Sequence, residues 1–175
     1  MTDLIVLGML LSEPQHGYRL KQQAGMIFGQ GELHNNLVYP LLRRFVANRW
    51  VTKKTVPGER GQNRQQYAIT PLGRQALMDR LRSFSEQDAR SEDEFRVRVG
   101  FFEMLSHEDR EKILEFREGA LRSRNQILSN LTKAMDLSAY GGEVVGFLQE
   151  QTETELAWIA RLRQVDSKAQ KNNTN

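Results

Sequence analysis

The sequence predicts a mainly α-helical protein with one small β-hairpin, divided into an N-terminal domain of mixed structure and a C-terminal helical domain. Three observations lead to this prediction. Apolar residues recur at helical spacing along much of the 175-residue chain. Residues 50–56 and 65–69 show the alternating side-chain pattern of β-strands, with many β-branched residues, on both sides of a turn-rich loop. Residues 1–82 hold 12 Lys and Arg against 5 Asp and Glu, a net of +7, whereas residues 83–175 hold 13 against 17, a net of −4.

The composition limits the classes of protein and of site. The chain holds no Cys, which excludes disulfides and thiolate chemistry and fits a reducing cytoplasm. The longest apolar run, Leu4–Leu11, is too short to span a bilayer and lacks the features of a signal peptide. The histidines His16, His34 and His107 share no ligand spacing, and no nucleophile motif or phosphate-binding glycine loop is visible. We therefore expect a cytoplasmic protein that is not an enzyme and has no metal, no cofactor and no membrane partner.

The first residues predict two helices. The apolar stretch Leu4–Leu11 forms the first helix, which Thr2 or Asp3 caps and which is buried on most sides. Residues 12–15 form a turn, and the second helix covers residues 16–28. The side chains of this second helix that we expect to face inward are Tyr18, Leu20, Ala24 and Ile27.

Residues 35–49 predict a third helix with two unlike faces. At about 100° per residue one face is apolar; it consists of Leu37, Val38, Leu41, Leu42 and Phe45. The other face carries amide, phenol and guanidinium groups between small residues; it consists of Asn36, Pro40, Arg43 and Ala47, flanked by Tyr39 and Arg44. Arg pairs with guanine and Asn with adenine in a major groove that is wide enough for a helix. The plainer interpretation is an ordinary solvated helix face.

The next segment predicts a hairpin and a further helix. Residues 50–56 alternate, residues 57–64 are rich in turn formers, and residues 65–69 return as a second strand. Thr70 and Pro71 then begin a helix that ends near Gln87, with Thr70 as its N-cap. The residues that we expect on the apolar side of this helix are Leu72, Ala76, Leu77, Leu81 and Phe84. The order of three helices, a basic hairpin and a helix is that of a winged helix-turn-helix.

This order predicts a nucleic-acid interface on the third helix and the hairpin. Cations on the hairpin suit phosphates beside the groove that the helix enters, and Arg19 and Lys21 of the second helix either contact the DNA backbone or are solvated. The residues that we expect to bind DNA are Asn35, Asn36, Tyr39, Pro40, Arg43, Arg44, Lys53, Lys54, Arg60 and Arg64.

Four stretches of the N-terminal domain resemble the PadR family of bacterial transcriptional regulators, over roughly residues 3–80. They are Leu4–Leu11, His16–Tyr18 with Leu20, Leu37–Phe45 and Gln66–Arg74. One departure is Arg49, because family members usually have Gly at this helix end, where it supplies a left-handed C-cap. We expect Asn48 to take that role. The segment around residues 46 and 47 also lacks the acidic residues usual in the family.

The second half predicts a helical domain over residues 91–166, after a winged domain over 1–87 and before a disordered tail over 167–175. Ser91 and Ser106 each begin a helix, the second of which runs to about Asp136, and a last helix ends near Val165. Long apolar seams run along these helices. We expect this domain to dimerise, with a monomeric bundle as the alternative. The dimerisation residues would be Leu114, Leu121, Leu128, Phe147, Leu148, Leu156 and Ile159.

The sequence and the resemblance together predict a DNA-binding transcriptional regulator. The resemblance implies a homodimeric repressor that binds double-stranded DNA at a palindromic operator and is released by a small phenolic or hydrophobic effector. The alternative is a winged-helix module that binds proteins or shapes DNA without an effector. We assign no residue to an effector, because aromatic residues at helical spacing are more often part of a core.

Overall fold

The structure is a computed structural model that describes residues 1–27, 35–57 and 63–173. The chain divides into two compact units. Unit 1 consists of residues 1–83 and 96–105, and unit 2 consists of residues 84–95 and 106–175.

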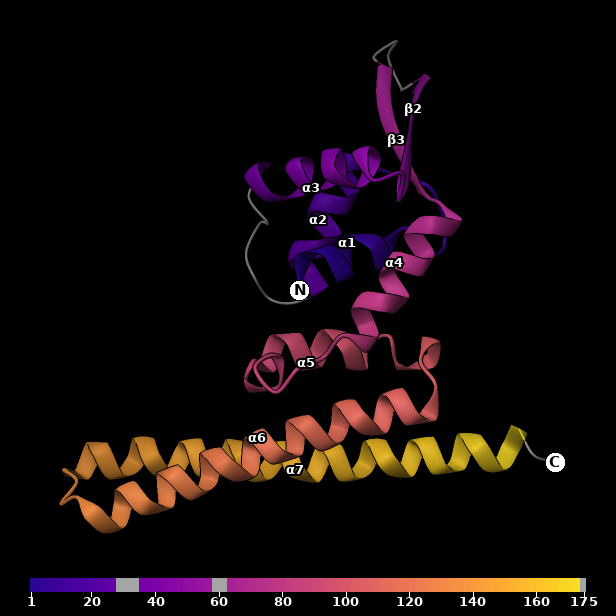
Figure 1. Ribbon diagram of the computed structural model, residues 1–175. Helices are drawn as coiled ribbons and strands as arrows, with labels where there is room; N and C mark the ends of the chain where they lie inside the picture. Colours follow the sequence, from indigo (N-terminus) through magenta and orange to yellow (C-terminus); the bar gives the residue numbers. More distant parts are fainter. Residues whose placement is uncertain (28–34, 58–62, 174–175) are drawn as a thin grey trace. The chain divides into compact units, whose positions relative to one another are not determined.

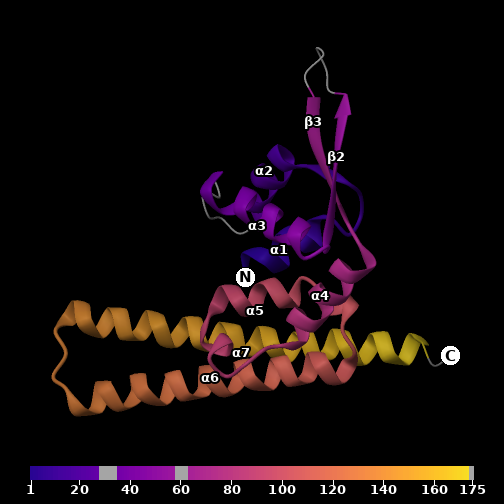
Figure 2. The same ribbon diagram turned by 45° about the horizontal axis from the view of Figure 1, so that its top comes forward.

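Unit 1 combines helices with a small antiparallel sheet (Figure 1). Its elements are α1 (Thr2–Met9), β1 (Gln15–His16), α2 (Gly17–Ile27), α3 (Asn35–Ala47), β2 (Val51–Pro57), β3 (Asn63–Ile69) and α4 (Pro71–Arg82). The described strands pair antiparallel in the order β1-β3-β2, with Val51 opposite Ile69 and His16 opposite Gln66. The short strand β1 was not expected, because residues 12–15 were interpreted as a turn and His16 as the start of a helix. The hairpin β2–β3 extends beyond α1, α2 and α3 as a wing in both views (Figures 1 and 2).

The core of unit 1 consists of apolar side chains from α1, α3 and α4, which are buried as expected; they include Leu4, Leu7, Val38, Leu42, Phe45, Leu77 and Leu81. Three side chains predicted to face inward are exposed instead, namely Tyr18, Leu37 and Leu72. Tyr18 lies about 200° from Leu20 around α2, so the two cannot share a face. Leu72 lies about 140° from Leu77 around α4, and Leu37 lies at the edge of the apolar face of α3, about 100° from Val38. The side chains of Ala24 and Ile27 lie outside the described part of the structure.

The helix α3 ends in a Schellman motif, in which a residue in the left-handed region reverses the chain. The N–H of Trp50 donates to the Phe45 carbonyl (2.8 Å), the N–H of Arg49 donates to the Val46 carbonyl (3.0 Å), and Arg49 has φ 58°. The Trp50 and Phe45 rings pack with centroids 5.7 Å apart, which is the hydrophobic contact that accompanies this motif. The prediction that Asn48 takes the left-handed role is therefore wrong, because Arg49 takes it.

The start of α4 is bonded to the start of the wing. The side chain of Thr70 accepts a hydrogen bond from the Gly73 N–H (3.0 Å), as predicted for an N-cap, and its hydroxyl donates to the Arg49 carbonyl (2.7 Å). The Thr70 N–H donates to the Trp50 carbonyl (2.9 Å). A Cβ on Gly73 would lie only 2.0 Å from that same carbonyl oxygen, so this position admits no side chain. The predicted cap on α1 is wrong, since α1 begins at Thr2 after Met1 and has no side-chain cap.

Residues 96–105 belong to unit 1, although the sequence predicted them as part of the helical domain. The ring of Phe101 occupies the space above Gly8 of α1, where a Cβ would lie 2.2 Å from the ring. Arg98 donates to the Ser83 carbonyl (3.1 Å), and Val97 and Leu105 are buried. The helix α5 (Glu92–Val99) therefore crosses the division between the units.

Unit 2 is dominated by the long helices α6 (His107–Ala134) and α7 (Ala139–Asn173), which lie side by side (Figures 1 and 2). Single 3-10 turns occupy Asp88–Arg90 in unit 2 and Phe102–Met104 in unit 1. The predicted caps are confirmed, since the Ser91 hydroxyl accepts from the Glu94 N–H and the Ser106 hydroxyl from the Asp109 N–H. Residues 167–173 continue α7 and do not form the predicted disordered tail. The predicted fold class, mainly α with a small hairpin, is confirmed.

The two long helices are antiparallel and joined by ion pairs along their length. Arg117 forms a bidentate pair with Glu155, both contacts being 2.7 Å, and Arg163 bonds to Glu111 and Glu118, also at 2.7 Å. His107 at the start of α6 lies 2.6 Å from an oxygen of Asp166 near the end of α7. No helix in the described ranges is both long and apolar enough to cross a membrane.

Candidate nucleic-acid interface

The outward face of α3 carries the polar groups that the sequence placed there. Tyr39, Pro40 and Arg43 are exposed, and Val38 and Phe45 are buried on the opposite side. Arg43 forms no ion pair or hydrogen bond within the described residues, so its guanidinium is available to a ligand. The side chains of Asn35 and Asn36, in the first turn of α3, lie outside the described part.

A cavity of about 680 Å³ opens beside this face, between α2, α3 and β3. Two arginines and several hydroxyl groups surround it. Its lining residues are His16, Gly17, Tyr18, Arg19, Tyr39, Arg64, Gln65 and Tyr67. Cations and hydroxyl donors of this kind bind phosphate oxygens. Tyr39 and Arg64 were predicted to be part of the interface. Tyr18, which is exposed and lines the cavity, was not. The signal was present in the His16–Tyr18 motif, to which no role had been assigned.

Gly17 allows Tyr39 to lie close to the start of α2. A Cβ at this position would lie 3.0 Å from the Tyr39 ring and 3.4 Å from the Tyr67 ring. The two tyrosines and Arg43 also interact electrostatically. Burial raises the pKa of the Tyr67 hydroxyl above its usual value, the neighbouring Tyr39 raises it further, and Arg43 opposes both effects. The Tyr67 hydroxyl is therefore neutral at physiological pH. Because Gly17 has no side chain, the Tyr39 ring can lie against the start of α2.

The cations of the wing lie on different faces of the hairpin. Lys53 lies opposite Tyr67, whereas Lys54 lies opposite Gln66 and shares its face with Arg64. Lys53, Lys54 and Arg64 are all exposed. Because side chains alternate along a strand, the two lysines project in opposite directions. Lys54 and Arg64 therefore project from one face of the hairpin, and Lys53 projects from the other face together with Tyr67. Arg60 lies outside the described residues.

Arg44 was predicted to bind DNA but is bonded within the chain. Its Nη2 lies 2.8 Å from an oxygen of Asp3 in α1, which also receives the Nη1 of Arg80 at 2.6 Å. Arg19, which lines the cavity, forms an exposed pair with Glu13 at 3.0 Å. The structure thus brings Tyr39 and Arg64 together at one cavity and directs Arg44 elsewhere.

The predicted dimerisation residues divide by burial. Leu114, Leu121, Leu128 and Ile159 are buried within the chain, so they form the core of unit 2 and are not a free surface. Leu148 and Leu156 are half-buried, and Phe147 is 58% exposed. Other apolar side chains are exposed near the turn between α6 and α7; they include Ile127, Leu131, Met135, Tyr140 and Val144.

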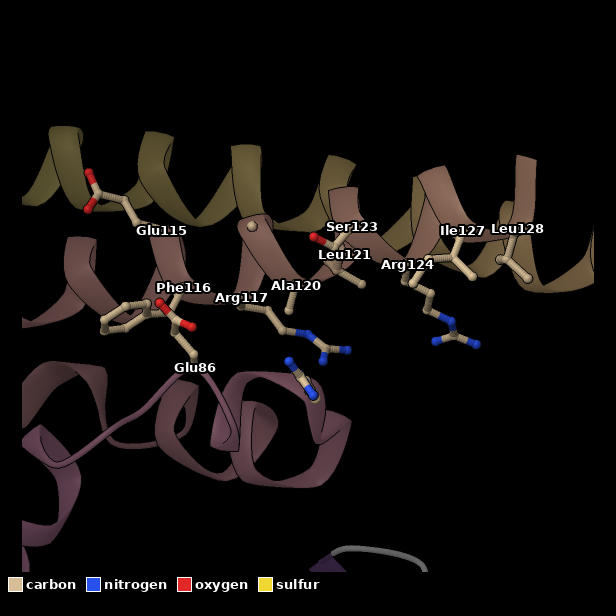
Figure 3. Close-up of a pocket in the computed structure, with 12 residues that line it drawn as sticks. Glu86, Glu115, Phe116, Arg117, Ala120, Leu121, Ser123, Arg124, Ile127 and Leu128 are labelled. Carbon is tan, nitrogen blue, oxygen red and sulfur yellow. The ribbon is translucent and has the colours of Figure 1, made fainter. Parts of the chain in front are cut away.

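A second cavity, of about 660 Å³, lies within unit 2 along one side of α6. Phe116, Ala120 and Ile127 supply apolar surface, and the guanidinium groups of Arg117 and Arg124 point to the same side of the helix (Figure 3). The Arg117 group is fully engaged by Glu155 and by the Ala89 carbonyl, the latter at 2.7 Å. Among the described side chains, none pairs with Arg124. No group of His, Asp and Glu suited to a metal ion occurs in the described part of the chain.

These features define a winged helix-turn-helix protein with an additional helical unit. Residues 6–79 match the family model described as the transcriptional regulator PadR-like family. This part of the chain is a PadR-like domain, and the resemblance noted from the sequence is confirmed for it. No curated protein matches the chain.

Solved structures similar to the chain include the following three. Bacillus subtilis PadR, solved in complex with operator DNA, has 18% identity and a TM-score of 0.46, and the match covers 93% of this chain and 98% of that one. A transcriptional regulator of Thermoplasma acidophilum has 29% identity and a TM-score of 0.42, over 45% of this chain and 74% of that one. A Streptococcus mutans protein has 22% identity and a TM-score of 0.40, over 91% and 96%.

Proposed function

We propose that the chain is a sequence-specific DNA-binding regulator of transcription, in which α3 enters the major groove and the cavity and wing bind the adjoining phosphates. The observation that carries this proposal is the exposed Arg43 on α3, which has no ion-pair or hydrogen-bond partner among the described residues. It lies beside a cavity that Arg19, Arg64 and three tyrosines line. An arginine on a helix in the major groove pairs with guanine, and cations at the groove edge fix the register. We propose that the chain acts as a repressor, since binding across a promoter would block transcription.

The test compares a duplex selected by the wild-type chain from a random pool with a scrambled duplex of equal length, each at two salt concentrations. Arg43→Ala should cost about 1–3 kcal/mol on the selected duplex and less on the scrambled one. Arg64→Gln should weaken binding to both and lower the salt slope by about 1. Arg122→Gln is the matched control, because it removes one positive charge from an exposed arginine on α6.

Three outcomes of this test count against the proposal. If Arg43→Ala and Arg122→Gln behave alike, α3 does not read bases. If the wild-type chain binds every duplex equally, the architectural alternative is favoured. If it binds none, the winged unit serves a protein partner.

We propose further that the DNA-binding form is a homodimer. Helix-turn-helix proteins commonly bind two half-sites as dimers, and a single small winged domain has little contact area for specific binding. The surface for a second copy would be the exposed apolar side chains at the turn between α6 and α7, with Phe147 and Tyr140 the largest. A patch of exposed apolar side chains is typical of a protein interface.

An effector would bind in the cavity along α6. A volume of about 660 Å³ lies in the range of small-molecule sites. Its apolar wall at Phe116 and Ile127, next to Arg124, which has no partner among the described side chains, suits a small aromatic acid. Such an effector releases DNA only if it binds the DNA-free conformation more tightly. Addition of 4-hydroxycinnamic acid should weaken the complex with the selected duplex, and Phe116→Ala should reduce this effect. Equal DNA affinity with and without the acid would count against this effector class.

A further inference from the structure

The carboxylate of Asp3 joins the helices α1, α3 and α4 of unit 1. One oxygen, Oδ2, receives both Nη2 of Arg44 on α3 (2.8 Å) and Nη1 of Arg80 on α4 (2.6 Å), while Asp3 itself stands in the first turn of α1. The Asp3 side chain is only 19% exposed, whereas the two arginines are 50% and 41% exposed.

Aromatic rings extend this cluster to the end of α3. The guanidinium of Arg80 lies 5.1 Å from the centre of the Trp50 ring, and that of Arg44 lies 5.7 Å from the centre of the Phe45 ring. The two rings pack on each other within the Schellman motif. The Asp3 carboxylate is thus the common partner of two cations that also contact the rings at the end of α3.

A single exposed ion pair contributes little, because water screens it and two long side chains lose freedom. The Asp3 cluster differs in three respects: its carboxylate is mostly covered, it binds two arginines, and each arginine comes from a different helix. Two cations on one carboxylate also leave an excess of positive charge. If Asp3 were neutral, the half-exposed Arg44 would be a free cation on the same helix as Arg43.

We propose that Asp3 is a positioning residue for DNA discrimination, which fixes the orientation of α3 and withholds Arg44 from phosphates. This inference rests on the proposed DNA-binding function. Phosphate contacts carry no sequence information by themselves, so an additional free arginine strengthens binding to any DNA. A recognition helix that is held less firmly also loses some of its base contacts. Both effects of removing the carboxylate reduce the ratio of specific to non-specific affinity.

The test is the isosteric change Asp3→Asn, measured on the selected and the scrambled duplexes. We expect tighter binding to the scrambled duplex, with a salt slope steeper by about 1, the contribution of one more phosphate contact. We expect the specificity ratio to fall on the order of tenfold, the scale of one mismatched base pair. Adding Arg44→Gln to Asp3→Asn should restore the wild-type salt slope, while Arg44→Gln alone should change it little.

Asp79→Asn is the matched control. Asp79 is an exposed carboxylate on α4 whose described hydrogen bond comes from Gln75, so its loss changes the net charge equally without releasing Arg44. If Asp79→Asn steepens the salt slope as much as Asp3→Asn does, net charge explains the effect and the proposal is overturned.

A measurement without DNA separates this proposal from the proposed function. The losses of Tm from Asp3→Asn and Arg44→Gln should be non-additive by about 2–4 °C, because both remove the same contact. Additive losses would mean that the cluster does not hold α3, and would overturn the inference even if the wild-type chain binds DNA. Non-additive losses in a chain that binds no DNA would leave the cluster intact but remove its role in discrimination.

Discussion

Arg49 occupies a backbone position that glycine fills at the least cost. Its φ of 58° lies in the left-handed region, where a Cβ approaches the following carbonyl oxygen. The sequence indicated that one residue at this helix end must adopt the left-handed conformation. Asn48 was the predicted residue, because asparagine tolerates this conformation well. The hydrogen-bonding register of the Schellman motif decides the position, and it counts from Phe45 and Val46 to Arg49 and not to Asn48. That register could not be read from residue preferences alone.

Replacing Arg49 with glycine should stabilise the chain. Arg49→Gly removes a left-handed cost of about 1–2 kcal/mol, offset in part by the greater freedom of glycine in the unfolded chain. We expect a net gain of about 1 kcal/mol in the free energy of unfolding, measured by urea denaturation. The control is Asn48→Gly, at the neighbouring position without a positive φ, which should give no gain. Equal gains from both changes would contradict the account of Arg49.

Gly73 and Gly119 should respond to alanine in opposite directions. A Cβ on Gly73 would lie 2.0 Å from the Trp50 carbonyl oxygen, a backbone atom bonded to Thr70. Gly73→Ala should therefore lower the free energy of unfolding by about 1–3 kcal/mol. Gly119, inside α6, has nothing within 4 Å of its Cβ position, so Gly119→Ala should raise it by up to about 1 kcal/mol. Thermal denaturation of both variants distinguishes close packing from helix propensity.

Residue types predicted part of the candidate site, and the limits have a physical origin. The amphipathic pattern of α3 correctly placed Tyr39 and Arg43 on an exposed face. It could not assign Arg44, because Arg44 is bonded to Asp3, a residue far away in sequence that only the folded chain brings near. It also missed Tyr18, since the HGY motif shows no helical period and its place at the cavity depends on the pairing of β1 with β3.

At the scale of elements, the α6–α7 pair was the most predictable part of the chain. A serine cap predicted the start of α6 and regular apolar seams predicted both helices, and Leu114, Leu121 and Leu128 are indeed buried. What the seam covers could not be predicted, because one apolar stripe fits a helix of the same chain or of a second copy equally well. Arg117 could not be foreseen either. Its burial is possible because the Glu155 carboxylate neutralises its charge and the Ala89 carbonyl accepts a further hydrogen bond.

The α6–α7 pair should weaken in acid through Glu118. Hydrogen bonds from Arg122 and then from Arg163 lower the pKa of the Glu118 carboxyl below its usual 4.5. A carboxyl whose pKa is lower in the folded than in the unfolded chain stabilises the fold above the unfolded value, and this contribution disappears as pH falls through the folded value. Thermal unfolding at pH 7 and at pH 3 should show a smaller acid-induced loss in Glu118→Gln than in the wild-type chain.

The control for this acid effect is Glu150→Gln, because Glu150 is an exposed carboxylate on α7 with no described partner. Its acid-induced loss should equal that of the wild-type chain. An acid response that is unchanged in Glu118→Gln would mean that the contacts of Arg163 with α6 do not depend on this carboxylate.

At the scale of the whole molecule, oligomerisation is the property most open to test. Phe147, 58% exposed on α7, belongs to the apolar surface proposed for a second copy. Phe147→Glu should raise the dimer dissociation constant by at least about tenfold, because it removes buried apolar area and introduces a charge. Sedimentation velocity over a range of concentrations measures the change. Leu72→Glu, on α4 and 52% exposed, is the matched control and should leave the dissociation constant unchanged.

The division of the chain into units was predicted near the correct place but with the wrong connectivity. The predicted end of the helix after the wing gave a boundary at residue 87, and the first segment of unit 1 ends nearby at Ser83. Residues 96–105 return to unit 1 because Phe101 fits above Gly8 and Arg98 bonds to Ser83. Sequence patterns assign neighbouring residues to the same domain. They therefore do not predict that residues 96–105, which lie within the second half of the chain, pack in unit 1.

The return of this segment has a consequence for how the protein is made. A ribosome releases the chain from its N-terminus, and domains commonly fold as they emerge. Here α1 is synthesised first, but the ring that fills the space above Gly8 comes with Phe101, after the whole wing and α4 have been added. A nascent chain halted at residue 87 therefore presents an uncovered apolar surface on α1, and one halted after Leu105 does not. Unit 1 is therefore complete only after residues 96–105 have been synthesised, although the sequence assigns these residues to the helical domain.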